Sequence, residues 1–116
     1  MADLTLYGLK TCDTCRNAMK ALKAAGQPVA FVDLRADDRL AERLPGWLDA
    51  VGAERLINTR STTWRGLGDG ERARAQSDPA GLLGDYPTLI KRPVIEQAGE
   101  TIHVGWTAES RAALGL

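Results

Sequence analysis

The order of apolar and polar positions predicts three elements in the first third of the chain. "LTLYGL" is a short β-favouring run and predicts a strand over residues 3–8. Apolar residues then recur at helical spacing, which predicts a helix over residues 13–25 that ends at a capping Gly26. "VAFVDL" predicts a second strand over residues 29–34. These elements form a β-α-β unit, so we expect the two strands to be parallel with a right-handed crossover.

The middle of the chain predicts a helix followed by a long polar segment. Asp37 or Asp38 can cap a helix over residues 40–51, where leucine, tryptophan and valine follow a three-and-four rhythm. Pro45 lies inside this helix and predicts a kink or a late start. Residues 58–76 are polar and punctuated by glycine, which predicts a surface segment with at most short helical turns. Loops of this length are often functional.

The last third predicts a short helix, a hairpin and a final helix. Asp78 can cap a helix that ends near Gly84. Two β-rich runs on either side of residues 98–99 predict an antiparallel hairpin. Thr107 can cap a last helix. Three of its residues are expected to be buried, namely Ala112, Ala113 and Leu114.

This order of elements, β-α-β, helical insertion, β-β-α, predicts an α/β protein with a thioredoxin-like, glutaredoxin-type fold. Such a fold has a four-stranded mixed sheet with flanking helices. The chain has 116 residues and is 44% hydrophobic, so we expect a single domain over residues 1–116.

Composition narrows the possible settings and partners. The chain has no apolar stretch of membrane-spanning length, and "MADLTLYGLK" lacks the basic start and apolar core of a secretory signal. We therefore expect a cytoplasmic protein without a membrane partner. Fifteen basic residues balance fifteen acidic ones, so there is no net charge to attract nucleic acid. Direct binding to nucleic acid is not expected.

The candidate chemistry lies in "GLKTCDTCRNA", which contains the only two cysteines of the chain, Cys12 and Cys15. Cys12 falls where the first strand gives way to the helix, so unpaired N–H groups and the helix dipole favour its thiolate and a lowered pKa. Lys10 and Arg16 are expected to assist this shift, and Asp13 to oppose it.

Cys15 shares a helix stripe with Ala18, Met19 and Leu22, which predicts a buried thiol. Such a thiol could resolve a mixed disulfide formed on Cys12. Two other interpretations remain: the cysteines pack as small hydrophobic residues, or they bind zinc. Zinc usually needs four protein ligands and only His103 remains beyond the two thiols, so we expect no metal.

Arginines and hydroxyls offer a possible anion site. Arg60 and Arg65 lie in "TRSTTWR", and Arg92 lies in "IKRPV". Guanidinium groups and hydroxyls bind oxyanions, although arginines at such positions can equally face solvent. Pro93 holds the residue before it in an extended conformation.

Four segments together resemble the arsenate reductase (ArsC) family, especially its YffB-like and Spx-like branches: "YGLKTCDTCRNAMKAL", "LINTRSTTWRGL", "YPTLIKRPVI" and "HVGW". The resemblance covers nearly the whole chain, and the Cys-x-x-Cys, T-R-S and K-R-P motifs at these separations make it specific. It implies a thioredoxin-like fold in which the Arg92–Pro93 peptide bond is cis and close to Cys12.

The resemblance also assigns roles to residues. In glutaredoxin-coupled arsenate reductases, the cysteine that matches Cys12 attacks arsenate, glutathione resolves the adduct, and glutaredoxin completes turnover. Arg92 matches one arginine that holds the oxyanion, and a second falls at Arg60 or at the neighbouring Ser61. The position of the third is occupied here by Gly105, a departure from the arsenate-reducing enzymes.

The implied function is a cytoplasmic thiol-dependent reductase that acts through Cys12 on an oxyanion or a mixed disulfide. Arg60, Arg92 and Pro93 would form its substrate site. No bound cofactor is implied; glutathione is the expected co-substrate and glutaredoxin a partner. The alternative is a redox-sensing regulator of the Spx-like branch, in which a Cys12–Cys15 disulfide changes binding to the RNA polymerase α subunit.

Overall fold

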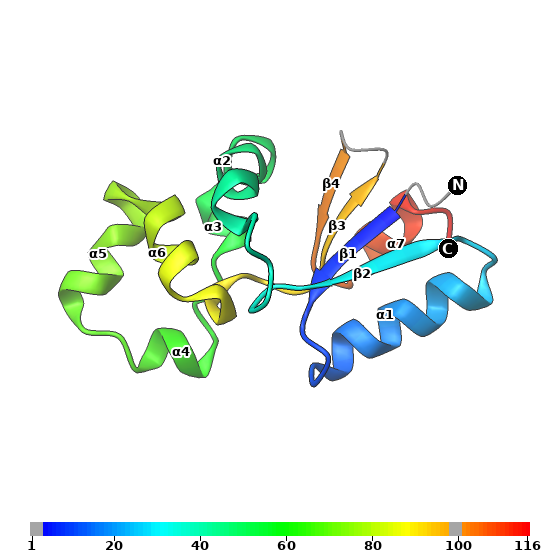
Figure 1. Cartoon of the computed structure of the whole chain (residues 1–116), viewed down its shortest axis with the longest axis horizontal. Coiled ribbons are helices and arrows are strands. Elements are labelled where there is room, and N and C mark those ends of the chain that lie inside the picture. Colours follow the sequence, from blue (N-terminus) through cyan, green and yellow to red (C-terminus); the bar gives the residue numbers. More distant parts are fainter. Residues whose placement is uncertain (1–3, 98–100) are drawn as a thin grey trace. The chain divides into compact units, whose positions relative to one another are not determined.

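Four strands form one mixed sheet in the computed structural model, which describes residues 4–97 and 101–116. The strands are β1 (Leu4–Gly8), β2 (Val29–Asp33), β3 (Val94–Gln97) and β4 (Thr101–Val104). Their order is β2-β1-β3-β4, with β1 drawn in blue between cyan β2 and orange β3 in Figure 1. The pair β1–β2 is parallel, and β1–β3 and β3–β4 are antiparallel. The mixed sheet and the hairpin are confirmed; the expected turn at residues 98–99 reaches beyond the described residues.

Helices connect and follow the strands. They are α1 (Asp13–Ala24), α2 (Leu40–Val51), α3 (Ala53–Leu56), α4 (Thr62–Arg65), α5 (Asp69–Ser77), α6 (Pro79–Asp85), the 3-10 turn η1 (Pro87–Leu89) and α7 (Ala108–Ala113). The chain divides into two compact units, Met1–Ala36 with Arg92–Leu116, and Asp37–Lys91. The first unit holds the sheet, α1 and α7, and the second holds the helical insertion. None of the helices in the described residues is both long and apolar enough to cross a membrane.

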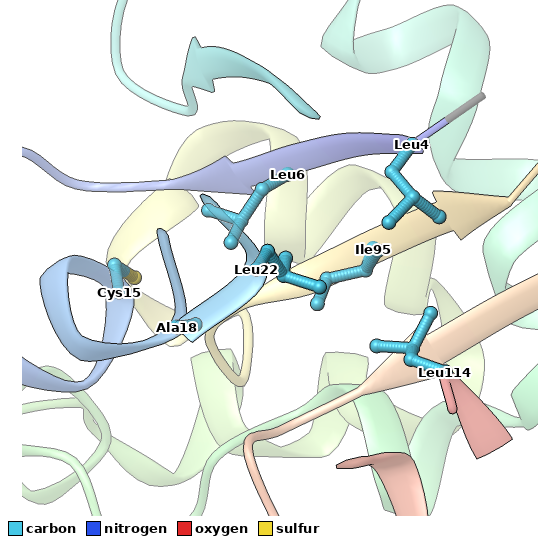
Figure 2. Packing of buried hydrophobic residues seen from close by; sticks show 7 residues of the cluster. All are labelled: Leu4, Leu6, Cys15, Ala18, Leu22, Ile95 and Leu114. Atoms are coloured by element: carbon cyan, nitrogen blue, oxygen red, sulfur yellow. The ribbon is translucent and has the colours of Figure 1, made fainter. Parts of the chain in front are cut away.

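The core of the first unit lies between the sheet and α1. Leu6 of β1 is paired with Ile95 of β3, so their side chains leave the same face of the sheet. The apolar stripe of α1 packs on that face (Figure 2). The buried cluster consists of Leu4, Leu6, Cys15, Ala18, Leu22, Ile95 and Leu114. Packing on the sheet therefore fixes which side of α1 is buried, and Cys15 is on that side.

The end of α1 follows the sequence prediction. Gly26 has a φ of +75°, a left-handed conformation that costs glycine little. Its N–H donates to the carbonyl of Lys23 at 3.0 Å, and the N–H of Gln27 donates to that of Leu22 at 2.9 Å. These two bonds form a Schellman motif, which satisfies carbonyls that the helix end leaves open.

The last helix confirms its predicted cap but not its predicted buried residues. Thr107 accepts a hydrogen bond from the N–H of Ser110, whose hydroxyl accepts one from the N–H of Thr107 in return. Ala112 and Ala113 are exposed, so that prediction was wrong for both. Leu114 is buried as predicted, and Ser110 lies four residues before it on the same side of the helix.

In the second unit, α2 differs from the prediction at its start. Its N-cap is Arg39, not Asp37 or Asp38. Asp37 instead accepts a hydrogen bond from the backbone N–H of Arg39 at 3.1 Å and forms an ion pair with Arg43 at 2.8 Å. The helix begins at its first apolar position and continues through Pro45, so it does not start late.

The polar segment 58–76 was predicted to have at most short helical turns, which is wrong for its second half. There α5 is a nine-residue helix without a buried residue. Acidic residues in its first turn suit the helix dipole. Arg74 pairs with Glu71 at 3.1 Å, Asp78 at 3.3 Å and Asp85 at 3.0 Å. Ion pairs and residues of high helix propensity stabilise α5. The prediction missed this helix because it relied on an apolar stripe, which α5 lacks.

The predicted cap of α6 is present, because the Asp78 side chain accepts a hydrogen bond from the N–H of Gly81 at 3.2 Å. The helix ends at Asp85, one residue beyond Gly84.

Candidate active site

Cys12 is the N-cap residue of α1, at the junction between the loop after β1 and the helix. Its backbone is extended, with φ −86° and ψ 118°. The N–H of Cys12 donates to the carbonyl of Leu9 at 3.1 Å, and its own carbonyl accepts from the N–H of Arg16 at 3.0 Å. These bonds fix a half-buried sulfur at the positive end of the helix, as the sequence predicts.

The surroundings of Cys12 favour its thiolate. Burial alone would raise the pKa of Cys12, but the backbone N–H and thiol of Cys15 and the Arg92 side chain outweigh it, so the pKa is lowered. The Cys12 side chain does not form the hydrogen bond of a regular helix cap. The nearby backbone N–H of Cys15 nevertheless stabilises the negative charge of the Cys12 thiolate and so lowers its pKa. The predicted direction of the shift is therefore confirmed.

The cation at the Cys12 sulfur is Arg92, which acts by a hydrogen bond and by its charge. The sequence had pointed to Lys10 and Arg16 instead. Arg16 is exposed and its guanidinium pairs with the carboxylate of Asp13. A cation from the far end of the chain thus contacts the sulfur, while the nearby Arg16 is engaged with an acid in its own helix.

Cys15 has the opposite environment, as its position in the helix stripe predicts. It is 1% exposed. Burial and, to a smaller extent, the neighbouring Cys12 raise the pKa of Cys15 to about 11, although the backbone of Leu9 and the charge of Arg92 work against the rise. The two thiols are hydrogen-bonded to each other. One sulfur is thus favoured as the anion and its partner as the neutral thiol.

Gly8 makes room for the buried sulfur. A Cβ at this position would overlap the Sγ of Cys15 and lie 3.2 Å from its Cβ. The sequence interpretation missed this role. The available signal was a glycine that interrupts a strand, which often marks a close approach by another element.

Arg92 and Pro93 reach the site just before β3. Their peptide bond is cis, as the resemblance implies, and Pro93 is buried. The carbonyl of Pro93 accepts a hydrogen bond from the N–H of Gly105 at 2.8 Å. The contact between Arg92 and Cys12 brings together residues from opposite ends of the chain.

Gly105, where the arsenate-reducing enzymes have an arginine, has a structural position of its own. It is buried with a φ of +81°, a conformation that favours glycine. The hydroxyl of Ser110 donates to the carbonyl of Gly105 at 2.9 Å. Ser110 was also missed by the sequence interpretation; its signal was a hydroxyl three residues after a capping threonine.

The other two candidate arginines belong to the second unit. Arg60 belongs to the second unit, where its side chain is exposed and its backbone N–H donates to the Asn58 side chain at 3.1 Å. Its role in the site stays a prediction. Arg65 ends α4, and its carbonyl accepts from Arg72 at 3.2 Å.

His103 is a residue of β4 whose ring Nε2 lies 3.0 Å from the side-chain oxygen of Gln97. Burial lowers the pKa of His103. Within residues 4–97 and 101–116, no three side chains of the histidine, cysteine, aspartate and glutamate types gather as metal ligands.

The arrangement can support nucleophilic chemistry at sulfur. A thiolate is the reactive form of cysteine, and Cys12 is partly exposed with its negative charge stabilised. A second thiol within hydrogen-bonding contact could attack a disulfide formed on the first.

Several known proteins are similar to this chain over most of its length. The profile of the ArsC family matches residues 7–114. An uncharacterised protein from Haemophilus influenzae is 36% identical over 100 residues, 85% of this chain and 88% of that protein. A solved structure of a protein named YFFB is 32% identical, with a TM-score of 0.85 over 95% of this chain and 96% of that one. The global transcriptional regulator Spx 1 of Bacillus cereus is 26% identical over 94 residues, 79% of this chain and 72% of that protein.

Proposed function

Because the chain belongs to the ArsC family, we propose that it is a cytoplasmic thiol-dependent reductase in which Cys12 is the nucleophile. One observation carries the proposal: the Cys12 sulfur lies at the N-terminus of α1 and is hydrogen-bonded by the Arg92 side chain. A cation and a helix end at one sulfur stabilise the thiolate, the form that attacks.

The proposed reaction begins with attack by the Cys12 thiolate on a disulfide. A bond forms between the Cys12 sulfur and one sulfur of the substrate, the substrate S–S bond breaks, and the other half leaves as a thiolate. The product is a mixed disulfide on Cys12. A glutathione thiolate then attacks the Cys12 sulfur, so that the bound half leaves as a thiolate and Cys12 carries glutathione. A second glutathione thiolate attacks the glutathione sulfur, Cys12 leaves as a thiolate, and glutathione disulfide is released.

Glutathione and Cys15 compete for this second step. Burial is the largest cause of the raised pKa of Cys15, and it still acts when Cys12 is in a mixed disulfide. Cys15 is therefore less ionised near pH 7 than an ordinary thiol of pKa ~8.5. Proximity favours Cys15. The acidity difference and the family resemblance support glutathione as co-substrate, with glutaredoxin as the partner that completes turnover.

The same site could also accept a small oxyanion, as arsenate reductases do. In the described part of the first unit, the guanidinium at the Cys12 sulfur is that of Arg92, and Gly105 stands where a third arginine would help. Arg60 would have to supply a second cation. A mixed disulfide needs less positive charge than an oxyanion, so we favour a mixed-disulfide substrate.

The test is a coupled assay with glutathione and glutaredoxin against mixed disulfides and arsenate. Cys12→Ser should abolish turnover of every substrate, because a hydroxyl is not ionised at neutral pH. Cys15→Ser is the matched variant: it should keep substantial activity if glutathione resolves the intermediate, and lose it if Cys15 does. Full activity of Cys12→Ser would reject the proposal.

A second candidate is a redox-sensing regulator, favoured by the relative named Spx 1. In this case a disulfide between Cys12 and Cys15 would change affinity for the RNA polymerase α subunit. A pull-down of the polymerase under oxidising and reducing conditions separates the two functions. Stable, redox-dependent recovery of the α subunit without reductase turnover would favour the regulator.

A further inference from the structure

A hollow of about 270 Å³ lies within the first unit and is bordered by Cys15, the buried member of the cysteine pair. Its apolar lining comes from the loop after β1, from α1 and from β2, and consists of Leu9, Cys15, Met19 and Phe31. We call it the α1 groove. Cys12, Met19 and Phe31 all pack against the buried cluster that contains Cys15. A group bound in the groove would therefore lie close to both thiols.

Three cationic side chains complete the lining: Lys10, Arg16 and Lys20, all exposed. On α1 the apolar residues Cys15 and Met19 are four positions apart, and so are Arg16 and Lys20. The helix therefore presents an apolar row next to a cationic row. Among residues 4–97 and 101–116, no acidic residue lines the groove.

A neighbouring acid neutralises one of the three rim cations, and the other two remain. Asp13 is the acid near it on α1, and it pairs with Arg16. Within the described residues, Lys10 and Lys20 have no hydrogen bond or ion pair through their side chains. Two ammonium groups are thus available to an anionic ligand.

We propose that the α1 groove binds one half of a disulfide substrate, and that this half is an apolar group, aromatic or branched aliphatic, that carries a carboxylate. The inference rests on the function proposed above, since the bound group is part of the substrate of Cys12. The apolar floor would contact the ring or branched chain of this group, and the cationic rim would bind its carboxylate.

The size of the groove supports a substituent and not a large cofactor. Ligand pockets for drug-sized molecules hold about 300–1,000 Å³, and a cavity of about 150 Å³ suffices for benzene. The α1 groove lies between these sizes, at about 270 Å³. It suits one substituted ring or a branched chain. Glutathione, which is polar throughout, would leave the apolar floor unused.

The test measures the rate at which Cys12 reacts with three small disulfides at pH 7.5. Dithiobis(nitrobenzoate) is aromatic and anionic, dithiodipyridine is aromatic and neutral, and dithiodiglycolate is anionic without a ring. In each case Cys12 bonds to one half and the other half leaves as a thiolate, so no further reductant is needed in a single turnover.

Lys20→Glu tests the rim, and Lys23→Glu is its control on an exposed position of α1 outside the groove. We expect Lys20→Glu to slow the reaction with dithiobis(nitrobenzoate) about three- to tenfold relative to dithiodipyridine. Lys23→Glu should leave this ratio unchanged. The ratio cancels any change in the reactivity of Cys12 itself.

Met19→Gln tests the floor at nearly constant volume. We expect Met19→Gln to slow the reaction of both aromatic disulfides about threefold or more. The reaction of dithiodiglycolate should be unaffected, because this reagent has no ring to contact the floor. Alkylation of Cys12 by iodoacetamide, which needs no groove, measures the intrinsic reactivity of Cys12 in each variant, and urea unfolding shows whether each variant is folded.

Three outcomes would overturn the inference. If Lys20→Glu leaves the ratio unchanged while Cys12 still reacts with dithiodipyridine, the groove assignment is rejected and the proposed function stands. If Lys20→Glu slows only the reduction of a glutathionylated protein, the groove binds a protein and the small-anion assignment is rejected. If wild type reacts with no disulfide faster than Cys12→Ser, the proposed function fails as well.

Discussion

At the residue scale, two identical side chains three positions apart have opposite acid–base behaviour. Cys12 is partly exposed at a helix N-terminus beside Arg92, and its pKa is lowered. Cys15 is buried against the sheet, and its pKa is raised to about 11. The difference arises because solvation and nearby dipoles act on the charged form of each sulfur.

The contribution of Arg92 can be measured by alkylation of Cys12 with iodoacetamide across pH. In wild type, the midpoint of the rate profile should lie below the ordinary thiol value. Arg92→Gln should move it upward and reduce the rate at pH 7 roughly tenfold, because a hydrogen bond to a charged group is lost.

Arg16→Gln is the control for this measurement, since Arg16 pairs with Asp13. It should shift the midpoint less than Arg92→Gln does. The role given to Arg92 would be contradicted if the midpoint for Cys12 in wild type equals the ordinary thiol pKa. It would also be contradicted if Arg16→Gln and Arg92→Gln shift this midpoint equally.

At the element scale, the position of the site depends on how closely α1 approaches β1. The stripe of α1 from Cys15 to Leu22 packs on the face of the sheet that carries Leu6 and Ile95 (Figure 2). Gly8, at the end of β1, leaves space for the Cys15 sulfur. The start of the helix is therefore held against the end of the strand, which places Cys12 beyond the C-terminal end of β1.

Gly8→Ala should destabilise the protein by about 1–3 kcal/mol, the usual cost of overpacking, because the new methyl group overlaps the Cys15 sulfur. Gly46→Ala is the control. Gly46 lies within α2, and a Cβ added there meets no neighbouring atom within 4 Å. Because alanine favours helix, this variant should not be destabilised. Urea unfolding measures both. Equal stability of Gly8→Ala and wild type would show that the sulfur can move aside without cost.

At the scale of the whole molecule, the cysteine site is built from the two ends of the chain. Met1–Ala36 supplies both cysteines, and Arg92–Leu116 supplies Arg92, Pro93 and Gly105. The helical insertion Asp37–Lys91 forms a unit of its own. Folding must therefore bring residues about 80 positions apart into contact before the thiolate is stabilised.

The raised pKa of Cys15 predicts how stability depends on pH. Below pH 9 the thiol is neutral in both folded and unfolded chains. Between pH 9 and about 11 the unfolded chain releases its proton and the folded chain retains it, so folding stability should fall as pH rises. A shift of two units corresponds to about 2–3 kcal/mol.

Urea unfolding of reduced wild type and Cys15→Ala between pH 8 and pH 11 measures this effect. Cys12 is present in both proteins, so only the part of its lowered pKa that depends on Cys15 remains in the stability difference between them. The stability difference between the two proteins should shrink by about 2–3 kcal/mol across this range. Parallel curves would contradict the burial effect.

Local signals sufficed for much of the fold. The strands, α1, the caps Gly26, Asp78 and Thr107, and the junction position of Cys12 depend on neighbours within a few residues, which a sequence displays directly. The start of α2 and the length of α5 were missed for a related reason. In both, side chains without an apolar pattern provide the stabilisation: Asp37 pairs with Arg43, and Arg74 with three acids.

The sequence alone therefore determined the order of elements and the identity of the nucleophile candidate, because helix dipoles, caps and periodicity are local. Only the tertiary structure decided that Arg92 is the cation at Cys12, that Gly8 makes room for Cys15, and that an apolar groove with a cationic rim lies beside the pair. These features depend on which distant segments pack together, and side-chain contacts across such distances have no local signature in the chain.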